Sequence, residues 1–85
     1  MPMTTPFLVG FAEAVVSLLV ESRLVEIRPD GRSRVVVFVA DWLATEARGG
    51  SLLSHLERAL LACPDVEELY ADVDDLKRVV DGLAA

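Results

Sequence analysis

The residues best suited to chemistry are a lone histidine, His55, and a lone cysteine, Cys63. A nucleophilic thiolate needs an activating neighbour, and His55 lies about two helical turns before Cys63. Ser51 and Ser54 are near His55, but Ser54 is its immediate neighbour and points from another helical face. We therefore expect no catalytic residue. His55 is predicted to be a solvated surface side chain, and Cys63 a small buried hydrophobe.

Two other motifs are incomplete as binding sites. Asp72, Asp74 and Asp75 resemble the start of a calcium loop, but the glycine and the distal glutamate that such a loop needs are missing. Gly49 and Gly50 lack the spacing and the Lys or Ser of a phosphate loop. The aspartates are instead placed to cap a helix and to complement its dipole. The sequence predicts neither a metal site nor a cofactor.

The chain is acidic, with a formal net charge of −6 and one lysine. Most of that charge lies in residues 49–85, which hold eight acids and three bases. Binding to nucleic acid depends on Lys and Arg that neutralise phosphates, so the charge balance argues against DNA, RNA or an anionic membrane as a partner.

The compartment is expected to be a reducing cytoplasm, because one cysteine allows no intramolecular disulfide. The residues before the first apolar run carry no positive side chain and do not read as a signal peptide. That run, residues 7–20, is too short and too polar to span a bilayer. Frequent Ala, Val, Leu, Arg and Asp favour a bacterial source.

The first predicted helix covers residues 7–22, with Pro6 at its start. Its polar side chains Glu13, Ser17 and Glu21 are spaced by four and form one narrow stripe, and nearly everything else is apolar. A surface helix has a wider solvated face. Because 53% of the chain is hydrophobic, we expect part of this helix to be buried against a partner.

The middle of the chain has two interpretations. Residues 24–28 alternate like a strand, and Pro29, Asp30 and Gly31 form a turn in which Gly31 is expected to take positive φ. The β-branched run that follows could complete a hairpin of 24–28 with 33–39. The longer apolar pattern favours a helix over 33–47, ending at Gly49.

The remaining elements are a helix over 51–62, a short strand over 66–71 that could pair with 24–28, and a helix capped by Asp72. The expected fold is therefore a mainly α, four-helix domain with two short strands, covering residues 1–85. The alternative is α+β with a hairpin at 24–39. The order of the first five elements resembles a winged-helix domain, although no sequence motif supports that resemblance.

The predicted function is a non-catalytic protein–protein interaction module, either an adaptor, an oligomerisation element or a regulatory subunit, that binds itself or another protein. The alternative is a transcription-associated regulator of the winged-helix type.

Asp41, on an apolar segment, is expected to be an N-cap or the buried partner of an arginine; alternatively it is a binding-site acid. Charge docking onto an acidic partner would use Arg28, Arg32 and Arg34. The expected anchors of the protein contact are apolar and mostly aromatic: Phe7, Phe11, Val15, Phe38 and Trp42.

Overall fold

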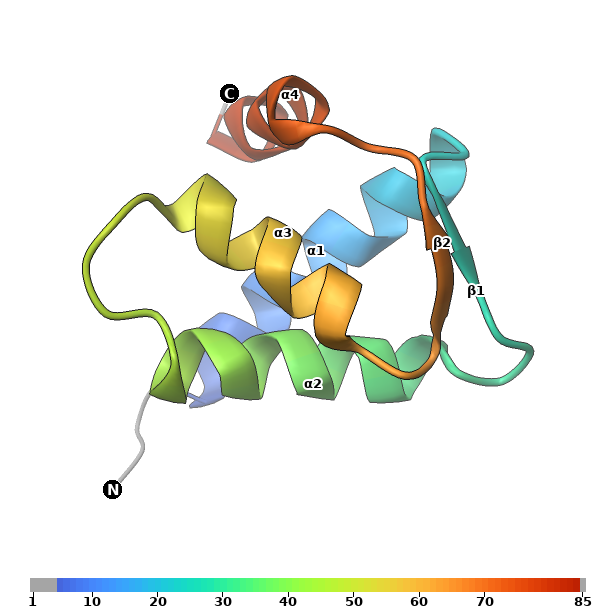
Figure 1. Cartoon of the computed structure of the whole chain (residues 1–85), viewed down its shortest axis with the longest axis horizontal. Helices are drawn as coiled ribbons and strands as arrows, with labels where there is room; N and C mark the ends of the chain where they lie inside the picture. Colours follow the sequence, from blue (N-terminus) through green and yellow to red (C-terminus); the bar gives the residue numbers. More distant parts are fainter. Residues whose placement is uncertain (1–4, 85) are drawn as a thin grey trace.

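The computed structural model describes residues 5–84, which form four helices and a two-stranded antiparallel sheet in the predicted order (Figure 1). The mainly helical class with two short strands is confirmed. Within this range no helix is both long enough and apolar enough to cross a membrane. The elements are α1 (Thr5–Glu21), β1 (Val25–Ile27), α2 (Arg32–Thr45), α3 (Leu52–Ala62), β2 (Val66–Leu69) and α4 (Val73–Ala84).

The core is enclosed by the four helices, because α1 and α3 each pack against α2 and α4. Ala12, Val15, Val16 and Leu19 of α1 are fully buried, and they recur with helical spacing, so one side of the helix faces inward. Leu56 of α3 and Leu76 of α4 are also fully buried, and they belong to the same cluster. The core of the single chain therefore already absorbs much of the apolar surface of α1.

The segment after the turn is a helix, and the alternative hairpin is wrong. Val35, Val36 and Val39 are buried at helical spacing within the core cluster. This burial outweighs the preference of β-branched residues for strands. The partner of β1 is β2, which runs antiparallel to it and pairs Val25 with Leu69.

The sheet contains a bulge that explains an irregular pattern in β2. Glu26 lies opposite Glu68, Ile27 lies opposite Val66, and Glu67 is the extra residue between the two pairs. Simple alternation would point Val66 and Leu69 to opposite faces. The bulge allows both to lie partly buried against the core while the glutamates face solvent.

The turn between β1 and α2 differs in detail from the prediction. Asp30, not Gly31, has the positive φ (61°), and the Gly31 N–H donates to the Arg28 carbonyl at 2.8 Å. Gly31 has φ −94° and is required for another reason: a Cβ there would lie 3.0 Å from that carbonyl oxygen and 3.2 Å from Asp65 Cβ. A glycine therefore lets the turn pack directly against the α3–β2 connection.

The last two helices begin with the predicted caps. Ser51 Oγ accepts a hydrogen bond from Ser54 N at 3.1 Å. At α4 the capping is reciprocal: Asp75 N donates to Asp72 Oδ1 at 2.9 Å, and Asp72 N donates to Asp75 Oδ2 at 3.1 Å. Both helix starts are thus fixed by local side chains.

Candidate protein-binding site

The most apolar hollow described on the surface lies along the outer side of α2, where the α3–β2 connection approaches it. We call it the α2 groove. Its volume is about 470 Å³, and it is open to solvent along its length. In Figure 1, α2 lies along one border of the molecule, with α1 and α3 on its inner side. The groove is lined by Ser33, Arg34, Val37, Phe38, Asp41, Pro64 and Asp65.

Val37 is an exposed apolar residue of the groove. Its side chain is 59% exposed, although Val36 beside it is buried and Val39 fully so. Residues 35, 36 and 39 share the inward face of α2, and position 37 lies on the far side of the helix. The fold therefore places a β-branched hydrocarbon in solvent on the outer face of a helix whose other valines fill the core.

Two aromatic rings stiffen the groove floor. Phe38 and Trp42 stack with their centroids 6.0 Å apart and their planes inclined by 29°. Both are half-buried and pack against the core cluster. The indole Nε1 of Trp42 is buried without a hydrogen-bond partner among the described residues. Phe38, which lines the groove, is therefore held between this indole and the core.

Arg34 and Asp65 form a forked ion pair at the rim of the groove. Arg34 Nε donates to Asp65 Oδ2 at 3.1 Å, and Arg34 Nη2 donates to Asp65 Oδ1 at 3.3 Å. The hydrogen bond to Asp65 raises the pKa of Arg34 further above its ordinary value. The Asp65 side chain is mostly buried while that of Arg34 is 62% exposed. The pair thus fixes the direction of a guanidinium that still faces solvent.

Asp41 is neither a helix cap nor a buried partner for an arginine. It lies in the third turn of α2, on the exposed face, and the N-cap of that helix is Gly31. Within residues 5–84 its carboxylate has no ion pair. The expectation of a satisfied structural acid is therefore wrong, and a free carboxylate lies at the end of the groove opposite Arg34.

The α1 anchors proposed from the sequence are not part of the α2 groove. A second hollow of about 310 Å³ joins α1 to α2 through Val9, Glu13 and Val37, and Phe7 and Phe11 line neither hollow. Phe7 is 75% exposed and Phe11 is half-buried against the core. Val15 is fully buried and packs within the chain, so the surface described here does not include it.

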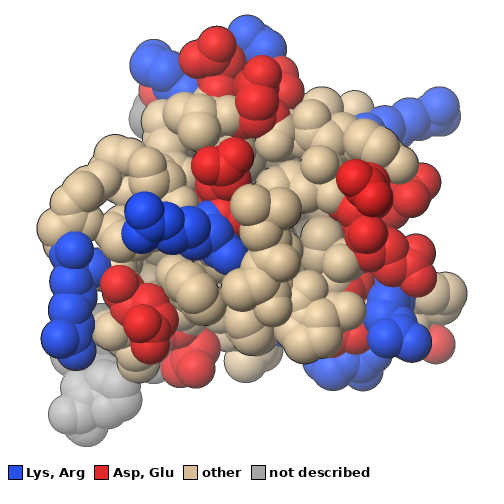
Figure 2. All heavy atoms as spheres, in the orientation of Figure 1, with Lys and Arg blue, Asp and Glu red and all other residues tan. Residues whose placement is uncertain are grey.

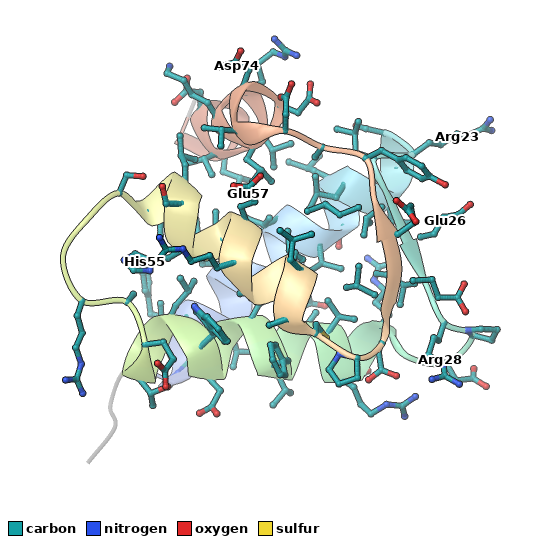
Figure 3. The ribbon with its side chains drawn as sticks, in the orientation of Figure 1. Arg23, Glu26, Arg28, His55, Glu57 and Asp74 are labelled. Atoms are coloured by element: carbon teal, nitrogen blue, oxygen red, sulfur yellow. The ribbon has the colours of Figure 1, made fainter. Side chains whose placement is uncertain are left out.

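The arginines named from the sequence take three different positions. Arg34 lies in the groove, whereas Arg32 donates to Ser17 Oγ of α1. Arg28 lies at the corner after β1 (Figure 3), where its backbone N–H donates to the Asp65 carbonyl at 2.9 Å. The structure therefore brings only Arg34 to the α2 groove, and Arg32 lines the second hollow.

His55 is not a solvated side chain. It is 8% exposed, and its Nε2 lies 2.5 Å from the Gly49 carbonyl oxygen. Gly49 and Gly50 both have positive φ, 69° and 73°, which turns the α2–α3 loop back over the ring. Figure 3 shows His55 pointing from α3 toward this loop. Its role in the described structure is to hold the loop.

Cys63 is buried at the end of α3, and burial raises the pKa of its thiol. A thiol that stays protonated is a weak nucleophile. In the part of the chain that the structure describes, no group of three or more His, Cys, Asp or Glu side chains is arranged to hold a metal ion.

Charged side chains are spread over the face of the molecule seen in Figure 2. Acidic groups gather over α4 and along the side occupied by the sheet, with basic groups among them, and an acidic and a basic group also lie over the middle of the face. Comparison of the chain with models of protein families, with curated proteins and with solved structures finds no match in any of the three. The groove must therefore be interpreted from its own geometry.

The sequence analysis missed four residues of the groove: Ser33, Val37, Pro64 and Asp65. Val37 could have been found, because a helix with Val35, Val36 and Val39 inward must point position 37 outward. Pro64 and Asp65 carry no such signal. They meet α2 only because the sheet and the turn at Gly31 bring the α3–β2 connection to the start of α2.

Proposed function

We propose that the chain is a non-catalytic protein–protein interaction module that binds its partner through the α2 groove. The observation that carries the proposal is the 59% exposure of Val37 beside the half-buried ring of Phe38, in a hollow lined mainly by apolar atoms. Covering exposed apolar surface of this kind with a partner lowers the free energy of the system. Adaptor, oligomerisation and regulatory roles are all forms of this function.

The nature of the other polar groups supports a binding role over a catalytic one. His55 bonds a backbone carbonyl, and the raised pKa of Cys63 disfavours the reactive thiolate. We place the module in a reducing cytoplasm, where a buried thiol stays free.

The alternative, a transcription-associated regulator of the winged-helix type, draws little support from α3. A helix that reads DNA presents basic side chains to the major groove. His55 is buried here, and the exposed Arg58 follows Glu57. We therefore favour protein contacts.

The proposal is tested by placing a photo-crosslinking amino acid, benzoylphenylalanine, at Val37 in the full chain within its native cells. The control position is Leu52, which is also exposed (44%) but lies at the start of α3, outside the groove. We expect a discrete crosslinked protein product from position 37 and little from position 52. Equal or absent crosslinking at both positions would contradict the proposal.

A further inference from the structure

The charges on α2 are arranged with an internal symmetry. Its basic residues, Arg32 and Arg34, lie in the first turn, and its acid, Asp41, lies in the third. Arg34 and Asp41 are seven residues apart, so they share one face of the helix. The midpoint between them falls between Val37 and Phe38, and each charge lies about 5 Å along the axis from that point.

A helix face with this pattern is complementary to itself when two copies run antiparallel. A two-fold axis between Val37 and Phe38 sets each Arg34 at the same height as the partner's Asp41, on both sides of an apolar centre. A parallel arrangement would set like charges against each other. We propose that the occupant of the α2 groove is a second copy of this chain, related by this two-fold axis. The inference rests on the proposed function and names its partner.

The ion pair with Asp65 prepares Arg34 for this contact. The guanidinium uses Nε and Nη2 toward Asp65, which leaves Nη1 and one Nη2 hydrogen free for a second carboxylate. Because Asp65 already orders the side chain, less rotamer entropy is lost when the partner's Asp41 arrives. Asp41 has no competing ion pair in the described chain, so its charge is available.

The net charge of the chain disfavours contacts between the acidic faces of two copies. The chain carries a net charge of −6, and two copies repel wherever acidic faces meet. The outer face of α2 offers both signs of charge and the exposed Val37. A 14-residue helix is about 21 Å long and covers less than the roughly 800 Å² per partner of a standard interface. We therefore expect a reversible dimer with a Kd on the order of 1–100 μM.

The geometry is tested by charge reversal, measured by sedimentation equilibrium of the full chain from micromolar to millimolar concentration. Arg34→Glu and Asp41→Arg each set like charges together in both pairs, so each variant alone should dimerise at least about tenfold more weakly. When the two variants are mixed in equal amounts, the glutamate introduced at position 34 of one chain meets the arginine introduced at position 41 of the other. The second pair of the same dimer joins the unchanged Asp41 to the unchanged Arg34. The mixture should therefore form a heterodimer about as tight as the wild-type dimer.

Controls separate association from folding. Arg58→Glu, on the exposed side of α3 and outside the groove, makes the same change of charge and should leave the dimer unchanged. Far-UV circular dichroism checks that each variant is folded. Arg34→Glu also places a glutamate beside Asp65 within the same chain, so a second measurement uses variants that keep Arg34. In a Cys63→Ala background treated with diamide, Val37→Cys should form a disulfide-linked dimer much faster than Leu52→Cys.

The outcomes distinguish this inference from the proposed function. A wild-type chain that is monomeric at all concentrations, or a mixture that fails to associate although both variants are folded, overturns the antiparallel dimer. If a monomeric wild-type chain still crosslinks a different protein from position 37 in cells, the interaction module stands and only the second copy is excluded. A crosslink at position 37 between two copies, together with recovery in the mixture, supports both.

Discussion

Replacement of glycine by alanine should have opposite effects at Gly31 and Gly10. Gly10 lies in the exposed interior of α1, and a Cβ there would meet nothing within 4 Å. Alanine is the better helix former and restricts the unfolded chain, so Gly10→Ala should stabilise the fold by about 0.5–1 kcal/mol.

At Gly31 the same methyl group meets fixed atoms. A Cβ would lie 3.0 Å from the Arg28 carbonyl oxygen, 3.2 Å from Asp65 Cβ and 3.3 Å from Asp65 Oδ1. The carbonyl is itself held by the Gly31 N–H. Overpacking costs about 1–3 kcal/mol, and a gain of about 0.4–1 kcal/mol from the stiffer unfolded chain offsets part of it. We expect Gly31→Ala to destabilise the fold by about 0.5–2 kcal/mol.

The assay is urea unfolding of both variants, monitored by circular dichroism, together with thermal unfolding scans. The urea concentrations at the unfolding midpoints should move in opposite directions, while the slope of the unfolding free energy against urea stays unchanged. For a domain of this size, Tm should differ between the variants by several degrees, since 1 kcal/mol corresponds to about 4–8 °C. A Gly31→Ala variant as stable as the wild type would refute the reasoning, because it would mean that the turn and Asp65 yield freely.

Two further predictions concern the core and the start of α4. Leu56→Ala removes a fully buried side chain and should lower the free energy of unfolding by about 2–5 kcal/mol. Leu61→Ala on the same helix, at a position 66% exposed, should change it by less than about 0.5 kcal/mol. Denaturant titration compares the two variants. Hydrogen bonds from the Asp72 backbone and the Arg78 side chain lower the pKa of Asp75 below its ordinary 3.8. The Asp75 carboxylate therefore stabilises the fold above pH 3.8, and this stabilisation is lost as the pH falls through the lowered pKa of the folded state. Asp75→Asn should flatten the acid limb of a stability–pH curve, and an unchanged limb would contradict the assignment.

Much of the fold is predictable because local signals agree with one another. Apolar residues at helical spacing, Pro6, Ser51 and the Asp72 cap all mark elements that the structure contains. The segment after Gly31 is harder, because its β-branched valines favour a strand whereas its longer apolar pattern favours a helix. Tertiary burial of Val35 and its neighbours against α1 decides between them, and that information lies outside the segment.

The candidate site is only partly predictable for the same reason. Phe38, Trp42 and Arg34 stand out by residue type, and the structure places all three at or beside the α2 groove. Asp65 has no distinguishing signal in the sequence and acquires its position from the turn at Gly31. His55 was misplaced because a helical wheel does not show a loop folding back over the ring.

The glutamates at the bulge of the sheet bear on how the chain behaves when it is crowded. Within residues 5–84 each strand has a single neighbour, so each presents an outer edge to which another strand could be added. Each copy would contribute two strands about 4.8 Å apart, so Glu26 and Glu68 would alternate along one row of carboxylates at about that spacing. Carboxylates that lie so close to one another repel. The opposition of Glu26 and Glu68 costs the folded chain some stability. In return, the repulsion between these carboxylates protects the chain from fibrous growth along its strands.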